Sequence, residues 1–134
     1  MKKFSHQITL NTNSEENALC LCEIERSDPD EVYSCRLLVR SGRFAYDGKF
    51  YFENLGNVID ALTRMADSLQ GEATLGQPAE ESYIRFVVNA NGHVTVSGLL
   101  VRIDALTQSL NFAFVTDQTV LRPLIRDLSL LSSR

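Results

Sequence analysis

The sequence has few of the residue types from which reactive sites are built. Its 134 residues include two histidines, His6 and His93. Covalent catalysis needs a nucleophile with a base in reach, and that base is usually histidine. His6 falls in a terminal segment without an acidic neighbour, and His93 follows Asn91-Gly92 at an expected hairpin tip, where it would be exposed. The sequence therefore predicts no catalytic residue, although an enzyme with a site assembled from distant residues stays open as an alternative.

Glycine-rich phosphate loops and metal motifs are also missing. The seven glycines never form a cluster that leads into a helix and a lysine, as a phosphate-binding loop requires. The spacing of histidine and cysteine does not match a zinc site, and no run of acids ends as a calcium loop does. We therefore expect no cofactor and no bound metal.

Cysteine is scarce and odd in number, with Cys20, Cys22 and Cys35. An odd count does not suit the disulfide framework of a secreted protein. On an alternating strand, Cys20 and Cys22 would point to one face together with Ala18 and Ile24. We interpret all three cysteines as small buried hydrophobic residues.

Positive charge is low and dispersed. The chain has 13 basic and 17 acidic residues, a net charge of −4, and the basic residues form no cluster. Nucleic acid is therefore not expected as a direct partner, because phosphate binding depends on clustered lysine and arginine. Long apolar runs are absent too, and the residues after Met1-Lys2-Lys3 contain no signal-peptide core, so we expect no membrane contact and a cytoplasmic location.

The pattern that is present predicts an α+β protein. The hydrophobic fraction of 44% and the lack of repeats or linkers favour one domain over residues 1–134. Alternating apolar residues predict strands, with turns at Ser27–Glu31 and Asn91-Gly92 and a bulge or kink at Asp47-Gly48. The expected strands lie at residues 4–10, 18–26, 32–40, 44–52, 72–75, 84–88, 94–101 and 109–115. A loop is expected over residues 76–82.

Two segments change to helical spacing. Apolar residues recur at three-and-four spacing from Leu55 to Leu69, with Asn54 as the expected N-cap and Gly71 as the C-terminal stop. A second apolar face runs from Leu121 to Leu131. The fold class is therefore α+β: an antiparallel β-sheet of about seven strands with two amphipathic helices, one central and one C-terminal, on one face.

A polar tetrad, Thr116-Asp117-Gln118-Thr119, joins the last aromatic strand to the second helix. Thr116 or Asp117 can accept hydrogen bonds from the first free backbone amides of the helix, so both are structural capping candidates. Pro123 is compatible with an early helical turn if the regular helix begins near Leu121. We interpret the tetrad as a structural joint and not as a reactive centre.

Three stretches resemble the small bacterial immunity proteins of the WapI type. They are "FYFENLGNVIDALTRMADSLQGEATL", "HVTVSGLL" and "SLNFAFVTDQTVLRPLIRDL", and together they cover roughly residues 50 to 130. The resemblance implies a cytoplasmic protein of a toxin-producing bacterium that binds and blocks the toxic domain of a polymorphic, contact-dependent toxin. Toxins of this type include RNases that act on tRNA, and inhibition of them needs no catalysis by the inhibitor.

If the toxin is a basic nuclease, acidic side chains should occlude or mimic the path of its substrate's phosphates. The densest acidic cluster lies in a segment whose single basic residue is Arg26, and we expect this cluster to be the toxin-binding surface. Its members are Glu23, Glu25, Asp28, Asp30 and Glu31. An ordinary solvated turn is the alternative for this cluster. For the whole chain, a self-associating structural or regulatory module that forms a homodimer also stays open.

Overall fold

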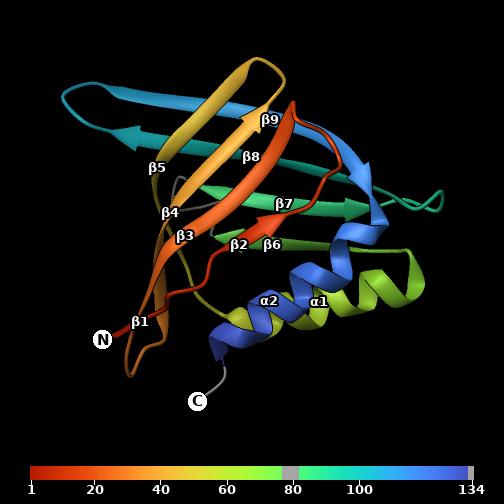
Figure 1. Ribbon diagram of the computed structural model, residues 1–134, viewed down its shortest axis with the longest axis horizontal. Coiled ribbons are helices and arrows are strands. Elements are labelled where there is room, and N and C mark those ends of the chain that lie inside the picture. The colour runs from red at the N-terminus through yellow and green to blue at the C-terminus, as the bar shows by residue number, and fades with distance from the viewer. Residues whose placement is uncertain (77–81, 133–134) are drawn as a thin grey trace.

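The computed structural model describes residues 1–76 and 82–132, in which nine strands form two antiparallel sheets accompanied by two α-helices (Figure 1). The α+β class and both helices are confirmed. The strands form a five-stranded and a four-stranded sheet instead of one sheet of about seven. Two sheets can cover each other's apolar faces, whereas two helices are too few to cover one broad sheet. Most of the loop predicted over residues 76–82 lies outside the described residues.

The first sheet contains the N-terminal strands. They are β1 (Lys2–Lys3), β2 (Ile8–Leu10), β3 (Asn17–Ser27), β4 (Val32–Ser41) and β5 (Phe44–Phe52). The order is β1-β3-β4-β5, and β2 pairs with β3 as well. The predicted hairpin across the Ser27–Glu31 turn is therefore present, and β1 and β2 are short strands on its outer side.

A bulge in β3 changes which of its side chains face the core. The pairing with β4 shifts between Cys22 and Glu25, and Glu23 has a positive φ of 50°. The extra residue turns Ile24 inward, where it is fully buried, while Cys20 and Cys22 lie half-buried on the opposite face. The prediction that Cys20, Cys22 and Ile24 share one buried face was therefore wrong.

Strand β5 is continuous, as predicted, but it has no bulge at Asp47-Gly48. Its pairing with β4 runs without a register shift from Phe44 to Phe52. Gly48 is needed for another reason. The Tyr46 side chain lies over Gly48, and a Cβ there would be 2.5 Å from the Tyr46 hydroxyl. The glycine thus makes room for a neighbouring ring and does not bend the strand.

The second sheet is a meander of β6 (Glu72–Gly76), β7 (Tyr83–Val88), β8 (His93–Ile103) and β9 (Thr107–Asp117). The hairpin predicted at Asn91-Gly92 joins β7 to β8. Because the pairing of β7 with β8 ends at Tyr83 and Leu99, the remainder of β8 and β9 continues as a two-stranded arm, on the left of Figure 1.

The two helices lie side by side, with α1 against β6 of one sheet and α2 against β2 of the other (Figure 1). Helix α1 (Leu55–Ser68) follows β5, and α2 (Leu121–Ser132) follows a 3-10 turn, η2 (Gln118–Val120). Each buries one apolar face. These faces consist of Leu55, Val58, Leu62 and Met65 in α1, and of Leu121, Leu124, Leu128 and Leu131 in α2.

The ends of α1 differ in detail from the expectation. Asn54 is the N-cap residue, but its backbone is left-handed and its side chain makes no capping bond. Its carbonyl accepts the Asn57 and Val58 amides instead. At the other end, Leu69 takes the left-handed conformation and donates its N–H to the Met65 carbonyl at 2.9 Å. Gly71 is therefore not the residue that ends the helix.

Candidate functional site

The acidic cluster singled out by the sequence is divided in two by the structure. Asp28, Asp30 and Glu31 lie exposed in the turn between β3 and β4, while Glu23 and Glu25 lie further along β3 at its bulge. The bulge directs Glu23 outward, and a positive φ of 54° at Glu31 tightens the turn. The five acids are therefore exposed or half-buried, but they form two groups and not one patch.

Asp28 is held by a buried arginine. Arg26 is 8% exposed, and its Nε donates to Asp28 Oδ1 at 3.0 Å. The same guanidinium donates through Nη1 to the Leu131 carbonyl at 3.2 Å, and the Tyr33 hydroxyl donates to that carbonyl at 3.3 Å. Asp28 thus compensates a charge that fastens the end of α2 to the first sheet.

Glu23 belongs to an ion-pair network on the outer face of the first sheet. Arg36 forms two hydrogen bonds to the carboxylate of Asp47, of 2.7 and 2.9 Å, and reaches Glu23 Oε2 at 3.4 Å. The hydrogen bonds from Arg36 lower the pKa of Asp47 below its ordinary value. The sequence pattern missed this network, because only the β4–β5 register brings Arg36 and Asp47 together. Asp30 and Glu31 have no ion pair among the described residues.

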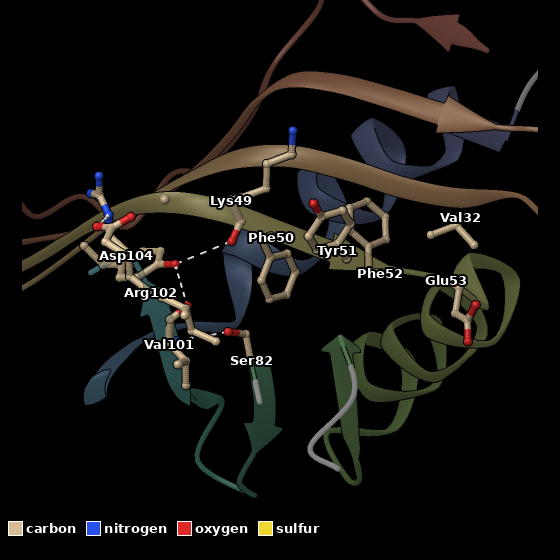
Figure 2. Close-up of a pocket in the computed structure, with 13 residues that line it drawn as sticks. Val32, Lys49, Phe50, Tyr51, Phe52, Glu53, Ser82, Val101, Arg102 and Asp104 are labelled. Carbon is tan, nitrogen blue, oxygen red and sulfur yellow. Dashed lines mark hydrogen bonds and ion pairs between the residues drawn. The ribbon is translucent and has the colours of Figure 1, made fainter. Parts of the chain in front are cut away.

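A cleft of about 580 Å³ opens between β5 and the β8 strand of the arm (Figure 2). The Tyr46 hydroxyl lies 3.2 Å from the Val101 carbonyl and 3.4 Å from the Lys49 carbonyl, and the Val101 N–H donates to Ser82 Oγ at 3.0 Å. Burial raises the pKa of Tyr46 above its ordinary value. These hydroxyls satisfy backbone groups, so their arrangement is structural.

Charged side chains stand at the rim of the same cleft. Arg102 pairs with Asp104 at 2.9 Å and donates to the Asp47 carbonyl at 2.8 Å, which ties the arm to β5. Neither histidine nor cysteine occurs among the described lining residues. Within the described part of the chain, the cleft therefore holds no nucleophile and histidine base within reach of each other.

The histidines and cysteines do not assemble elsewhere either. His93 is exposed at the hairpin end opposite Asp117, and His6 is half-buried against the ring of Phe4, 6.0 Å away. Over the residues that the structure describes, no three metal-binding side chains come together. Burial raises the pKa of Cys35 to about 12, and burial together with Cys20 raises that of Cys22, so the thiolate forms are disfavoured.

The joint after β9 is built around Asp117. Its Oδ2 accepts the Thr119 N–H at 3.3 Å at the start of η2. Hydrogen bonding by the Thr119 side chain, followed by this backbone bond, lowers the pKa of Asp117. Thr116 is 7% exposed and lies on the inner face of β9. The regular helix then begins at Leu121, and Pro123 falls in its first turn.

The arrangement defines an α+β protein with two antiparallel sheets and a two-stranded arm that extends beyond the end of β7. The model of the immunity protein WapI-like family matches residues 8–134, and the chain belongs to that family. The match extends the resemblance seen over residues 50 to 130 to almost all of the N-terminal strands. Membership in an immunity protein family implies that the chain neutralises a toxin and has a cognate toxin as its partner.

The fold is similar to that of a solved structure described as "Crystal structures of trypanosoma bruciei MRP1/MRP2". The superposition has a TM-score of 0.54 and 10% sequence identity, and covers 98% of this chain and 85% of that one. At this identity the likeness shows the fold alone. No curated protein matches the sequence. Among the described residues, no helix has the length and apolar character needed to span a membrane.

Proposed function

We propose that this chain binds the toxic domain of a bacterial polymorphic, contact-dependent toxin in the cytoplasm and blocks it without catalysing a reaction. The match of the immunity protein WapI-like family to residues 8–134 carries this proposal. Members of such a family are typically non-catalytic. Over the described residues, no three metal-binding side chains come together and neither histidine nor cysteine lines the cleft beside β5, which is consistent with inhibition by binding.

The charge of the chain favours a basic toxin such as a nuclease. The net charge is −4, and the exposed turn between β3 and β4 presents Asp30 and Glu31 without an ion-pair partner among the described residues. Opposite charges accelerate encounter and fix orientation. We therefore keep the acidic cluster as a contact surface for the toxin, with Asp30 and Glu31 as its main members. Asp28 and Glu23 are paired with Arg26 and Arg36, and Glu25 lies away from the turn, in β3.

Co-expression tests this function directly. The toxic domain encoded beside this chain's gene is induced in a bacterial host with and without the chain, and a toxic domain from an unrelated system serves as the control. We expect growth to be restored with the neighbouring toxin alone. Titration of the purified chain into a toxin activity assay should end at one inhibitor per toxin. Continued toxicity together with no binding in calorimetry would refute the proposal.

A further inference from the structure

Strand β9 forms a long open edge of the second sheet. It runs from Thr107 to Asp117 and pairs with β8 on one side, and in the described structure no strand pairs with its other side. The β8–β9 pairing is continuous, with no register shift. An edge of this kind exposes a row of unpaired backbone N–H and C=O groups that can accept a further strand.

The direction of these backbone groups follows from one hydrogen bond. The Gln118 N–H donates to the Gly92 carbonyl at 2.8 Å, just beyond the ends of the two strands. Hydrogen-bonded and non-bonded positions alternate in an antiparallel pair. The backbone N–H and C=O groups of even-numbered residues of β9 therefore bond to β8, and those of odd-numbered residues point away from β8, to the open edge. A bond from Ser41 Oγ to the Ala113 carbonyl, 3.1 Å long, reaches the edge from outside and agrees with this assignment.

Most of the usual protections of an edge strand are missing from β9, although Ser41 Oγ bonds its outward backbone at the Ala113 carbonyl. From Thr107 to Thr116 it contains no charged residue and no proline, and it has no bulge. The other described edges differ. Strand β5 carries Asp47 and Lys49, while Ser82 and Tyr46 bond the open backbone of β8 at Val101. Strands β1 and β2 have two and three residues, and β6 has five.

A groove of about 490 Å³ follows the β9 edge. One wall is Asn111–Val115, and the other comes from Asn17 and the turn between β4 and β5. Two apolar side chains stand exposed beside it, Phe44 at 67% and Val115 at 58%. The edge thus combines free backbone groups with an apolar surface, and these are the two components by which a sheet binds an extended segment.

We propose that an uncharged extended segment of the toxin domain adds to β9 between Thr107 and Val115 and becomes a fifth strand of the second sheet. This inference rests on the proposed function. The segment would exchange backbone hydrogen bonds with Ser109 and Asn111, accept one from the Ala113 N–H, since the Ala113 carbonyl is already bonded to Ser41 Oγ, and place an apolar side chain against Phe44. It carries no charge there, because the edge offers no group to compensate one. A basic toxin suits this place better than a second copy, because two chains of net charge −4 repel each other.

Two pairs of variants separate the edge from the rest of the sheet. Val115→Lys places a charge on the edge, and Val87→Lys makes the same change on the same outer face but on the interior strand β7. Asn111→Pro removes an outward N–H, which an edge tolerates, while Asn111→Ala changes the side chain and keeps that N–H. Thermal unfolding checks that each variant is folded before binding to the purified toxin domain is measured by calorimetry.

We expect Val115→Lys and Asn111→Pro to weaken toxin binding by about tenfold or more, and Val87→Lys and Asn111→Ala by about twofold or less. Amide hydrogen exchange measured by NMR gives a readout that needs no variant. The outward amides of Ser109, Asn111 and Ala113 should exchange quickly in the free protein and slowly in the complex, while the even-numbered amides of β9 stay slow in both.

Three outcomes would overturn the inference. If the unaltered chain binds toxin, but all four variants bind equally and the outward amides stay fast, the edge is not the contact and the proposed function stands. If the unaltered chain binds no toxin, the proposed function fails as well. If the outward amides are slow in the free protein and Val115→Lys converts a dimer to a monomer in light scattering, a second copy occupies the edge instead.

Discussion

The cysteines show how strongly one inserted residue changes the surroundings of its neighbours. The bulge at Glu23 leaves Cys20 and Cys22 half-buried on the outer face of the first sheet, whereas Cys35 is 2% exposed in the core. In the folded protein at pH 8, an aromatic disulfide reagent should label Cys20 and Cys22 and spare Cys35, whose pKa is about 12. Absorbance of the released thiol and peptide mapping measure this. In Cys35→Ala, unfolding should expose no thiol beyond the two already labelled in the folded protein. Equal labelling rates for all three cysteines of the unaltered protein would contradict the expectation.

Asp117 should make the stability of the joint depend on pH. Its pKa is lowered in the folded protein by the hydrogen bonds at Thr119, so its contribution is present above the unfolded pKa, near 4, and is lost as pH falls through the folded pKa. Asp117→Ala should therefore lower the melting temperature at pH 7 and have a smaller effect near pH 3. Asp117→Asn, which can still cap, should stay close to the original at pH 7. Thermal unfolding at both pH values decides this, and an Asp117→Ala effect independent of pH would contradict it.

Single residues were predictable from the sequence where only local chemistry decides their position. The exposure of His93 at a hairpin end and the burial of Cys35 followed from turn residues and strand alternation. The positions of Cys20 and Cys22 did not, because nothing in the local pattern marks a bulge. The pairing of Arg36 with Asp47 was likewise invisible, since it depends on the register of two strands.

At the scale of elements, Gly98 of β8 allows a close approach to the neighbouring strand β7. A Cβ at this position would clash with the Tyr83 carbonyl and lie 3.1 Å from Phe112 Cε1. Gly98→Ala should therefore push β8 away from β7 and lower the free energy of unfolding by about 1–3 kcal/mol. Urea unfolding measures the change.

Gly56→Ala provides the matched control. Gly56 lies in the first turn of α1, where a Cβ would meet nothing within 4 Å. This substitution should leave the stability unchanged or raise it by up to about 1 kcal/mol, because alanine favours helix more than glycine does. A Gly98→Ala protein as stable as the unaltered chain would show that β7 and β8 can separate at little cost.

The sequence predicted most elements, because each has its own periodicity: alternation gave the strands from β3 onward, and three-and-four spacing gave both helices. It did not reveal that the strands divide between two sheets. Short turns indicate which strands are antiparallel neighbours. The sequence of α1, which connects β5 to β6, does not indicate whether β6 joins the same sheet as β5 or another one. The two-stranded arm was missed for a related reason, since its length depends on where β7 ends opposite β8.

Across the whole molecule, the two surfaces proposed to meet the toxin lie apart. The β3–β4 turn with Asp30 and Glu31 lies towards the two chain ends, whereas β9 runs along the far side of the second sheet (Figure 1). Charge acts over a distance and mainly raises the rate of association, while strand addition makes close contacts that slow dissociation. The sequence identified the first surface from its charge, but it could not identify the second, because an open edge appears only once the sheet is assembled.

This division of roles predicts how charge reversal at the turn changes binding. In Asp30→Lys/Glu31→Lys, two reversals of two units each bring the net charge from −4 to 0. Asp28 stays unaltered, because removing it would leave the buried Arg26 without its carboxylate. With a basic toxin, the association rate at low salt should fall by about three- to tenfold, and the dissociation rate should change little.

The control is Asp60→Lys/Asp67→Lys, which makes the same change in net charge on the exposed face of α1. It also removes the exposed ion pair of Asp67 with Arg122, so thermal unfolding checks that this variant is as stable as the turn variant. Stopped-flow fluorescence at 20 and 200 mM salt gives both rates, and the loss in the turn variant should shrink at the higher salt, where screening shortens the range of the field to below about 10 Å. A greater loss in the turn variant than in the control places the acidic turn next to the toxin. Equal losses of association rate in the two variants would mean that the turn acts only through the net charge of the chain. An unchanged association rate in both would show that electrostatic attraction does not accelerate the encounter with the toxin.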